Sequence, residues 1–226
     1  TRFCQVTGVQ TCALPILVMK THKTILKACQ LALAVALAIG VTVGLSACRS
    51  DEQEIRASVE TMLKAFKNPT QENLSPYMSE ADKDSITVEQ LKESGIDFYE
   101  FLAHALKHFD YKINEVKVEG NTATVKLDIT NANIKSAMAD ARSEISNMSE
   151  DESKQLDQDG GSNAFIKKFM ESLYKKLDES TELVTTSVEL KMNKENGTWT
   201  VDEGSLNDFV GAVYGVGELF GPNVSD

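Results

Sequence analysis

Residues 122–129 read TATVKLDI, so that apolar side chains alternate with threonine, lysine and aspartate. Successive side chains of a β-strand point to opposite faces, and strict alternation therefore indicates a strand that is buried on one face only. The buried face would consist of Ala123, Val125, Leu127 and Ile129. Strands of this kind occur in antiparallel sheets whose other face meets water, and the rest of the fold can be built outward from this one.

The preceding segment, residues 111–118, is the expected partner of this strand, and residues 119–121 (EGN) would form the turn between them. Its apolar residues before Asn114 are out of phase with those after Glu115. A β-bulge inserts one extra residue into a strand and would restore the phase. We therefore expect a hairpin with a bulge near Asn114 and Glu115.

A second hairpin is predicted from residues 184–192 and 198–202. The first segment alternates, and the turn between the two contains Asn196-Gly197, a pair that favours positive φ and is a strong hairpin signal. In the returning segment Trp199 and Val201 share one face, and polar residues occupy the other. Trp199 is therefore expected in the core.

Apolar residues at helical spacing predict helices around the hairpins. The longest of these segments are residues 51–67, 97–109, 132–148, 163–177 and 204–219, with shorter helical turns near residues 71–78 and 87–93. Residues 149–162 read SEDESKQLDQDGGS and predict a flexible acidic loop. This order predicts an α+β fold in which a curved antiparallel sheet of two or more hairpins packs against helices.

A second short stretch of sequence indicates where in the cell the protein is located. Residues 45–48 read LSAC and resemble a bacterial lipobox, the site at which a lipoprotein precursor is lipidated and cleaved. The 20 residues up to Ala47 are uncharged, and RSDEQE follows Cys48 directly. The resemblance implies that Cys48 carries the lipid, begins the mature chain and attaches it to the membrane.

Residues 19–47 have the order of a secretory signal peptide, with lysines first, an apolar run next and small residues before Cys48. The run is also long enough to span a bilayer, so an uncleaved anchor is the alternative interpretation. Residues 6–16 read VTGVQTCALPI and resemble a translated sequencing adapter, and residues 1–18 are therefore expected to be a sequence artefact. Residues 48–51 would form a tether and residues 52–226 a single extracytoplasmic domain.

The charge of the chain from Cys48 onward restricts its partners. Four of the 23 basic residues precede Cys48 and all 34 acidic residues follow it, which leaves 19 basic residues and a formal charge of −15. Such a domain repels nucleic acid and remains soluble above a membrane. All four cysteines lie at or before Cys48, so neither a disulfide nor a thiolate nucleophile is expected in the domain.

The order of the elements and the two hairpins, over roughly residues 51–219, resembles that of secreted bacterial lipoproteins with domains of the nuclear-transport-factor-two-like, cystatin-like superfamily. This resemblance implies a curved sheet around a helix, forming a cone. Enzymes, ligand carriers and interaction domains all use such a cone, so the fold alone assigns no function.

The sequence offers few candidate sites. Glu100, His104 and His108 are spaced four apart on one predicted helix and could present two imidazoles and a carboxylate to a metal. The same spacing describes the solvated face of an amphipathic helix, which is the interpretation that we favour. No metal site and no cofactor is therefore predicted.

Two further patterns also have ordinary interpretations. Asp157, Asp159 and Gly160 resemble part of a calcium loop, but Ile166 stands where the EF-hand pattern needs a glutamate, and a solvated loop is favoured. Trp199 and Tyr111 could line a cavity inside the cone, but their strand positions favour the core. No nucleophile motif or phosphate-binding loop occurs, so an enzyme is not expected.

These observations predict a non-catalytic lipoprotein, lipid-anchored through Cys48 to the outer face of the cytoplasmic membrane, whose acidic domain binds another component of the cell envelope. The alternatives are a carrier of a small apolar ligand inside the cone and, less favoured, an enzyme of the same fold. A single-membrane bacterium would suit such a tether.

Overall fold

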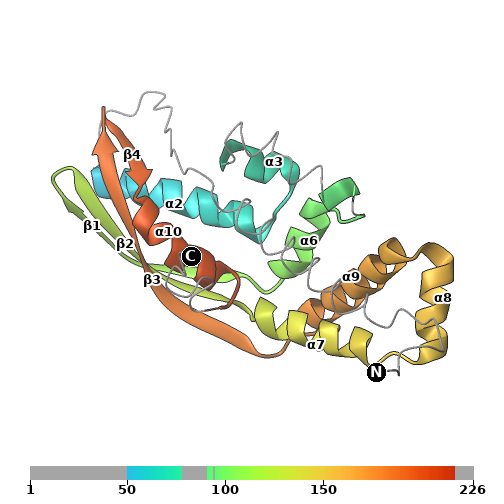
Figure 1. Ribbon diagram of the computed structural model, residues 1–226. Coiled ribbons are helices and arrows are strands. Elements are labelled where there is room, and N and C mark those ends of the chain that lie inside the picture. Colours follow the sequence, from blue (N-terminus) through green and yellow to red (C-terminus); the bar gives the residue numbers. More distant parts are fainter. Residues whose placement is uncertain (1–49, 78–90, 94, 217–226) are drawn as a thin grey trace, which may run out of the picture.

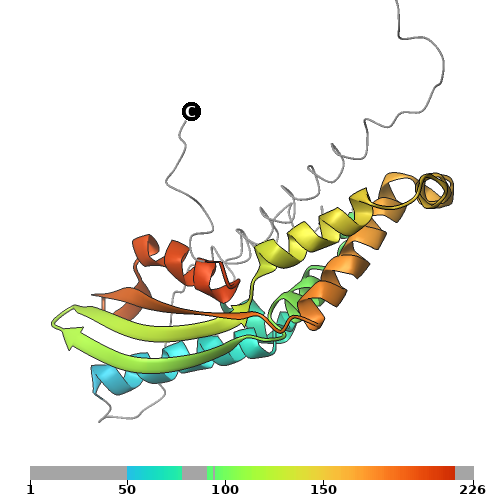
Figure 2. The same ribbon diagram turned by 90° about the horizontal axis from the view of Figure 1, so that it is seen from below.

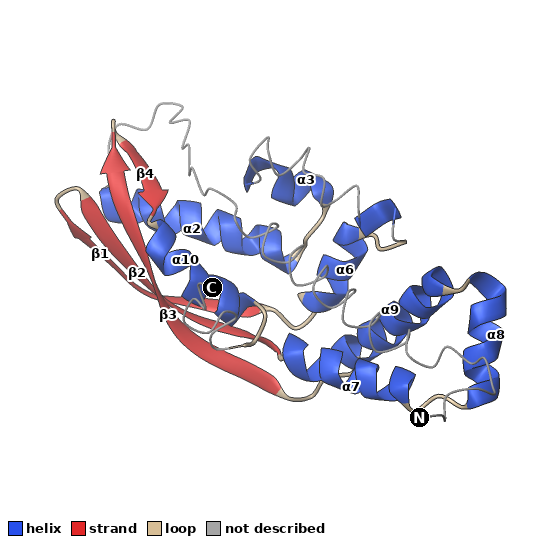
Figure 3. Ribbon diagram, in the orientation of Figure 1, coloured by secondary structure: helices blue, strands red, loops and turns tan. Residues whose placement is uncertain are grey.

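The structure is a computed structural model that describes residues 50–77, 91–93 and 95–216 (Figure 1). The strands gather at one end of the molecule, where helices also pack against them, and the other end is helical (Figure 3). In chain order the elements are α2 (Asp51–Lys67), α3 (Gln71–Leu74), the 3₁₀ turn η1 (Ser75–Tyr77), α6 (Phe98–Ala105), β1 (Asp110–Glu119), β2 (Thr122–Ala132), α7 (Ile134–Ser146), α8 (Glu150–Gly160), α9 (Ser162–Asp178), β3 (Leu183–Glu195), β4 (Thr198–Val201) and α10 (Glu203–Val213). The α+β prediction is confirmed.

The sheet is an open antiparallel meander in the order β1-β2-β3-β4. Its first hairpin contains the expected bulge, because the register between β1 and β2 shifts between Ile113 and Glu115. Its second hairpin turns at Asn196 and Gly197, which have φ of 52° and 84°. The positive φ values explain the Asn-Gly pair, since these residues adopt such angles at the lowest cost.

One face of the sheet is buried and carries the side chains predicted for β2. Val125, Leu127 and Ile129 have no exposed surface, and their β3 neighbours continue the apolar face. Helices α2 and α10 cover this face and meet at Phe66 and Phe209, whose ring centroids are 6.0 Å apart. The opposite face is polar and open to solvent, as alternation predicts.

Helices α7, α8 and α9 form an arm that projects beyond the end of the sheet (Figure 2). Residues 149–162 belong to this arm, so the prediction of a flexible acidic loop is wrong. Helix α8 begins with a capping box, in which Ser149 and Glu152 satisfy each other's backbone N–H groups, and Lys154 pairs with Glu150 one turn away at 2.7 Å. Because α8 has no buried residue, it is held by local interactions and by contact with α9.

The arm joins the sheet at a buried asparagine. Asn131 has no exposed surface, and its side-chain amide donates to the carbonyl oxygens of Ala105 at 2.9 Å and Val213 at 2.6 Å. The end of α10 comes so close to β2 that a Cβ on Gly215 would lie 2.4 Å from the oxygen of Ala132. Only glycine fits there, and its φ of +61° also requires one. Asn131 thus ties together the ends of α6, β2 and α10.

Other predictions differ in their limits. The helix predicted for residues 97–109 ends at Ala105. The last helix, predicted for residues 204–219, ends at Val213. Residues 87–90 of the predicted turn, the signal peptide and residues 217–219 lie outside the described residues. Within the described residues, no helix combines the length and apolar character that a membrane span requires.

Candidate functional site

The predicted lipidation residue, Cys48, lies outside the described residues, but it is three residues from Asp51 at the start of α2. Covalent geometry therefore keeps Cys48 within about 11 Å of Asp51. The Ser50 side chain caps α2 by accepting a hydrogen bond from the backbone N–H of Gln53, and Asp51 pairs with Lys194 of β3 at 2.8 Å. Any tether at Cys48 thus leads directly into an ordered part of the domain.

Both hairpin turns lie at this same end of the molecule (Figure 1). Lys194 stands just before the β3–β4 turn, and its backbone N–H donates to the carbonyl of Asn121 in the β1–β2 turn at 2.8 Å. The α7–α8–α9 arm lies at the opposite end of the sheet. The domain therefore has a tether end, defined by the start of α2 and the two hairpin turns, and an arm end.

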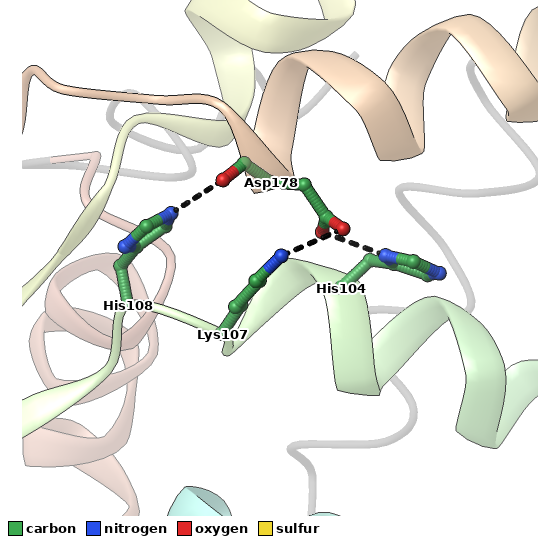
Figure 4. Close-up of polar contacts among 4 residues, drawn as sticks. All are labelled: His104, Lys107, His108 and Asp178. Carbon is green, nitrogen blue, oxygen red and sulfur yellow. Dashed lines mark hydrogen bonds and ion pairs between the residues drawn. The ribbon is translucent and has the colours of Figure 1, made fainter.

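The predicted metal candidates meet a different partner (Figure 4). His104 Nδ1 lies 2.7 Å from Asp178 Oδ1, and His108 Nε2 lies 3.2 Å from the backbone oxygen of Asp178. Lys107 Nζ contacts the other carboxylate oxygen of Asp178 at 2.8 Å. Glu100 is exposed, and within the described residues no group of His, Cys, Asp and Glu side chains is arranged to hold a metal ion.

Two local features explain this arrangement. Helix α6 ends at Ala105, so His108 does not continue the helical face that carries His104. Asp178 is the last residue of α9, where a helix presents unpaired carbonyl groups and the negative end of its dipole. The imidazole of His108 and the positive charge of Lys107 are therefore well placed there. Together with His104 and Asp178 they form a clamp that holds α6 against the end of α9.

The histidine and aspartate side chains of the clamp are half-buried, and opposing effects act on the pKa of Asp178. Burial raises the pKa of Asp178, but its hydrogen bonds and charge interactions with His104 and Lys107 outweigh that effect and hold the pKa below its usual value. Tyr174 stacks on His104 with ring centroids 4.1 Å apart, and burial raises the pKa of its phenol. The imidazole is thus fixed between an aromatic ring and a carboxylate, which is a structural role.

Replacement of Asp178 by asparagine is expected to lower the free energy of unfolding by about 1–2 kcal/mol at pH 7, because it removes two charge-assisted hydrogen bonds that are partly exposed. Since the folded-state pKa of Asp178 is depressed, its stabilisation is present above the unfolded pKa of about 3.9 and is lost as the pH falls through the folded value. Urea unfolding of Asp178→Asn and wild type should therefore differ at pH 7 and converge only as the pH falls through the lowered pKa of Asp178.

The matched control is Glu179→Gln, which removes an exposed carboxylate one residue along the chain that makes no ion pair with any described residue. It should leave the free energy of unfolding within about 0.5 kcal/mol of wild type at both pH values. A difference between Asp178→Asn and wild type that persisted unchanged at low pH would contradict the clamp.

The remaining candidates are also structural. Asp157 and Asp159 are exposed on α8 rather than in a loop. Trp199 is 2% exposed and lies in the core, as expected. Tyr111 is half-buried against Phe109, with Lys67 Nζ 5.4 Å from its ring centroid.

The sequence did not indicate a groove that the structure places beside β3. Strand β4 pairs only with Met192–Glu195 and then gives way to α10, so the earlier part of β3 has no neighbouring strand on that side among the described residues. A hollow of about 580 Å³ lies there. Its lining includes Ser187, Glu189 and Lys191 from β3 and Asp202, Ser205 and Asp208 from the start of α10.

The comparisons with known proteins give one distant likeness. A crystal structure of a protein from Bacillus subtilis, described as a "putative lipoprotein (ycdA)", is similar at a TM-score of 0.36 and 14% sequence identity. The match covers 80% of this chain and 55% of that chain, so this chain spans about half the length of its neighbour. No protein-family model and no curated protein matches the sequence. The likeness is too distant to assign a family.

Proposed function

We propose that the chain is a lipoprotein precursor whose domain is anchored through Cys48 to the outer face of the cytoplasmic membrane and binds another component of the cell envelope without catalysis. The observation that carries this proposal is the junction of the LSAC motif with a capped helix that begins at Asp51. A lipid on Cys48 would hold the domain against the bilayer, because the intervening chain is about 11 Å long at most.

The geometry of the domain gives this anchoring a direction. The tether end would face the bilayer, and the arm would point away from it. Helix α2 begins at the tether end and runs about 25 Å away from it, since an α-helix rises 1.5 Å per residue. The strongly acidic α8 would then be the part most accessible to other envelope components.

The packing of the core favours a binding surface over the carrier alternative. The two aromatic side chains that would line an internal ligand cavity are used otherwise: Trp199 is buried, and Tyr111 packs against Phe109. The formal charge of −15 also favours a protein or cationic partner over nucleic acid.

Two cysteine variants test the location and the direction. We expect Gln155→Cys on α8 and Glu195→Cys at the β3–β4 turn both to react with a membrane-impermeant maleimide on intact spheroplasts, because both positions are exposed and would lie outside the cytoplasm under this proposal. A fluorophore at Glu195→Cys should be quenched by a spin label on lipid headgroups, and one at Gln155→Cys should not. Labelling that required lysis would contradict the location, and equal quenching would contradict the direction.

A further inference from the structure

The free part of β3 presents unpaired backbone groups at the edge of the sheet. Lys194 donates its backbone N–H to Asn121, on the side of β2. In an antiparallel pair every second residue points the same way, so Met192, Leu190 and Val188 also direct their backbone groups toward β2. The alternate residues Thr185, Ser187 and Glu189 therefore point their N–H and C=O groups outward. None of these groups is hydrogen-bonded to a residue of the described ranges.

The start of α10 closes one end of this edge. The carbonyl of Lys191 accepts from the backbone N–H of Asp202 at 2.8 Å, and the N–H of Lys191 donates to Ser205 Oγ at 3.2 Å. The outward backbone groups of β3 are thus hydrogen-bonded from the β3–β4 turn back to Lys191, and those of the residues before Lys191 are not hydrogen-bonded to any described residue. Helix α10 continues beside the strand and forms the wall of the 580 Å³ groove.

The two edges of the sheet differ in their protection. Edge strand β1 carries a bulge and five charged side chains among ten residues, features that discourage further pairing. In contrast, residues 183–190 of β3 read LVTTSVEL, with Glu189 as the one charge and without proline, and the pairing of β2 with β3 is continuous. Leu183, at the start of this segment, is 47% exposed. The β3 edge is therefore suited to accept another strand.

The charge of the groove indicates what kind of strand would fit. Glu189, Asp202 and Asp208 bring three carboxylates to its lining against the single amine of Lys191, in a domain that is itself strongly acidic. A second copy of the chain would bring the same acidic groups to the interface and would be repelled. A basic peptide would be attracted, and its extended backbone would satisfy the free groups of β3.

We propose that the edge of β3 between Leu183 and Leu190 binds an extended, lysine- or arginine-rich segment of another envelope protein as an additional strand of the sheet. The lining of α10 would contact the side chains that alternate toward the groove, and Asp208 would pair with one of their positive charges. This inference specifies the partner of the proposed binding domain. It does not depend on the lipid at Cys48.

The test uses the full-length chain in detergent and a dye-labelled seven-residue peptide that alternates lysine with valine and threonine. Fluorescence anisotropy should detect binding that weakens with salt. Two control peptides separate the contribution of charge from that of backbone pairing. Glutamate in place of lysine should abolish binding, and N-methylation of the backbone nitrogens that face β3 should weaken it about tenfold or more.

Matched protein variants place the site. Glu189→Pro removes one outward N–H and should weaken binding about tenfold, whereas Glu189→Gln keeps that N–H and should weaken it only about two- to threefold. Asp208→Asn should resemble Glu189→Gln. Hydrogen exchange of the wild-type chain provides a readout without mutation, because the amides of Thr185, Ser187 and Glu189 should become protected when the peptide is added.

Three results would overturn the proposal. Equal affinities of the plain and N-methylated peptides would show that attraction is by charge alone, without strand pairing. Protection of the three amides before any peptide is added would show that the chain or a second copy already occupies the edge. Failure of wild type to bind the basic peptide would exclude the proposed partner class, and the same assay on Cys48→Ala keeps this outcome separate from any failure of lipidation.

Discussion

The Trp199→Ala variant is expected to lose about 3–5 kcal/mol of unfolding free energy, which is a large share of the roughly 5–15 kcal/mol typical of a domain. Trp199 is the largest fully buried side chain of the described core and is 2% exposed. Its indole Nε1 has no hydrogen-bond partner among the described residues, so its contribution comes from packing and from Lys194, whose Nζ lies 5.3 Å from the ring centroid. No disulfide is available in the domain to compensate for the loss.

Urea unfolding of the domain beginning at Arg49 measures this effect, and the midpoint should fall by roughly 1–3 M. Thr200→Ala is the control, because Thr200 is the next residue on β4 and points to the other face. Its hydroxyl donates to the carbonyl of Asn193 at 3.3 Å, so its removal should cost no more than about 1 kcal/mol. Equal midpoints for the two variants would contradict the assignment of Trp199 to the core.

The sheet could be predicted because its signals are local. The alternation of Val125, Leu127 and Ile129 fixes which face of β2 is buried, and Asn196-Gly197 fixes where the second hairpin turns. Even the bulge near Asn114 followed from a change of phase within one strand. Each of these features depends on residues that are neighbours in the sequence.

Helix α8 was missed because its composition is typical of a loop. Acidic residues and the pair Gly160-Gly161 dominate residues 149–162, and no apolar stripe marks a buried face. The sequence does contain the capping box of Ser149 and Glu152, which is a recognised helix start. That motif and the Glu150–Lys154 spacing are the two local signals in these residues that indicate a helix.

The clamp and the groove depend on tertiary contacts that the sequence does not reveal. His104 and Asp178 are 74 positions apart, and no local pattern pairs them. The free edge of β3 exists because β4 ends at Val201 and α10 starts at once, so only the observed pairing of these strands shows how much of β3 is left open. Sequence periodicity identifies strands, but it does not say which backbone groups remain unpaired.

The expected effect of Cys48→Ala is complete, because Cys48 is the residue to which the lipobox assigns the lipid. A single acyl chain holds a protein only weakly at a membrane, whereas two or more hold it firmly. Loss of the lipidated cysteine should therefore remove the firm acyl anchor and abolish incorporation of a fatty acid, which leaves only an uncleaved apolar run to hold the chain at the membrane. Cys29→Ala is the matched control, because Cys29 is a cysteine within the apolar run before the lipobox and should not carry the lipid.

Metabolic labelling with a fatty-acid probe, followed by membrane fractionation, tests the central claim most directly. We predict that wild type and Cys29→Ala incorporate the probe and remain with the membrane, and that Cys48→Ala incorporates none. Unchanged labelling of Cys48→Ala, or an unlabelled wild-type chain that stays in the membrane through an uncleaved apolar segment, would contradict the lipoprotein proposal.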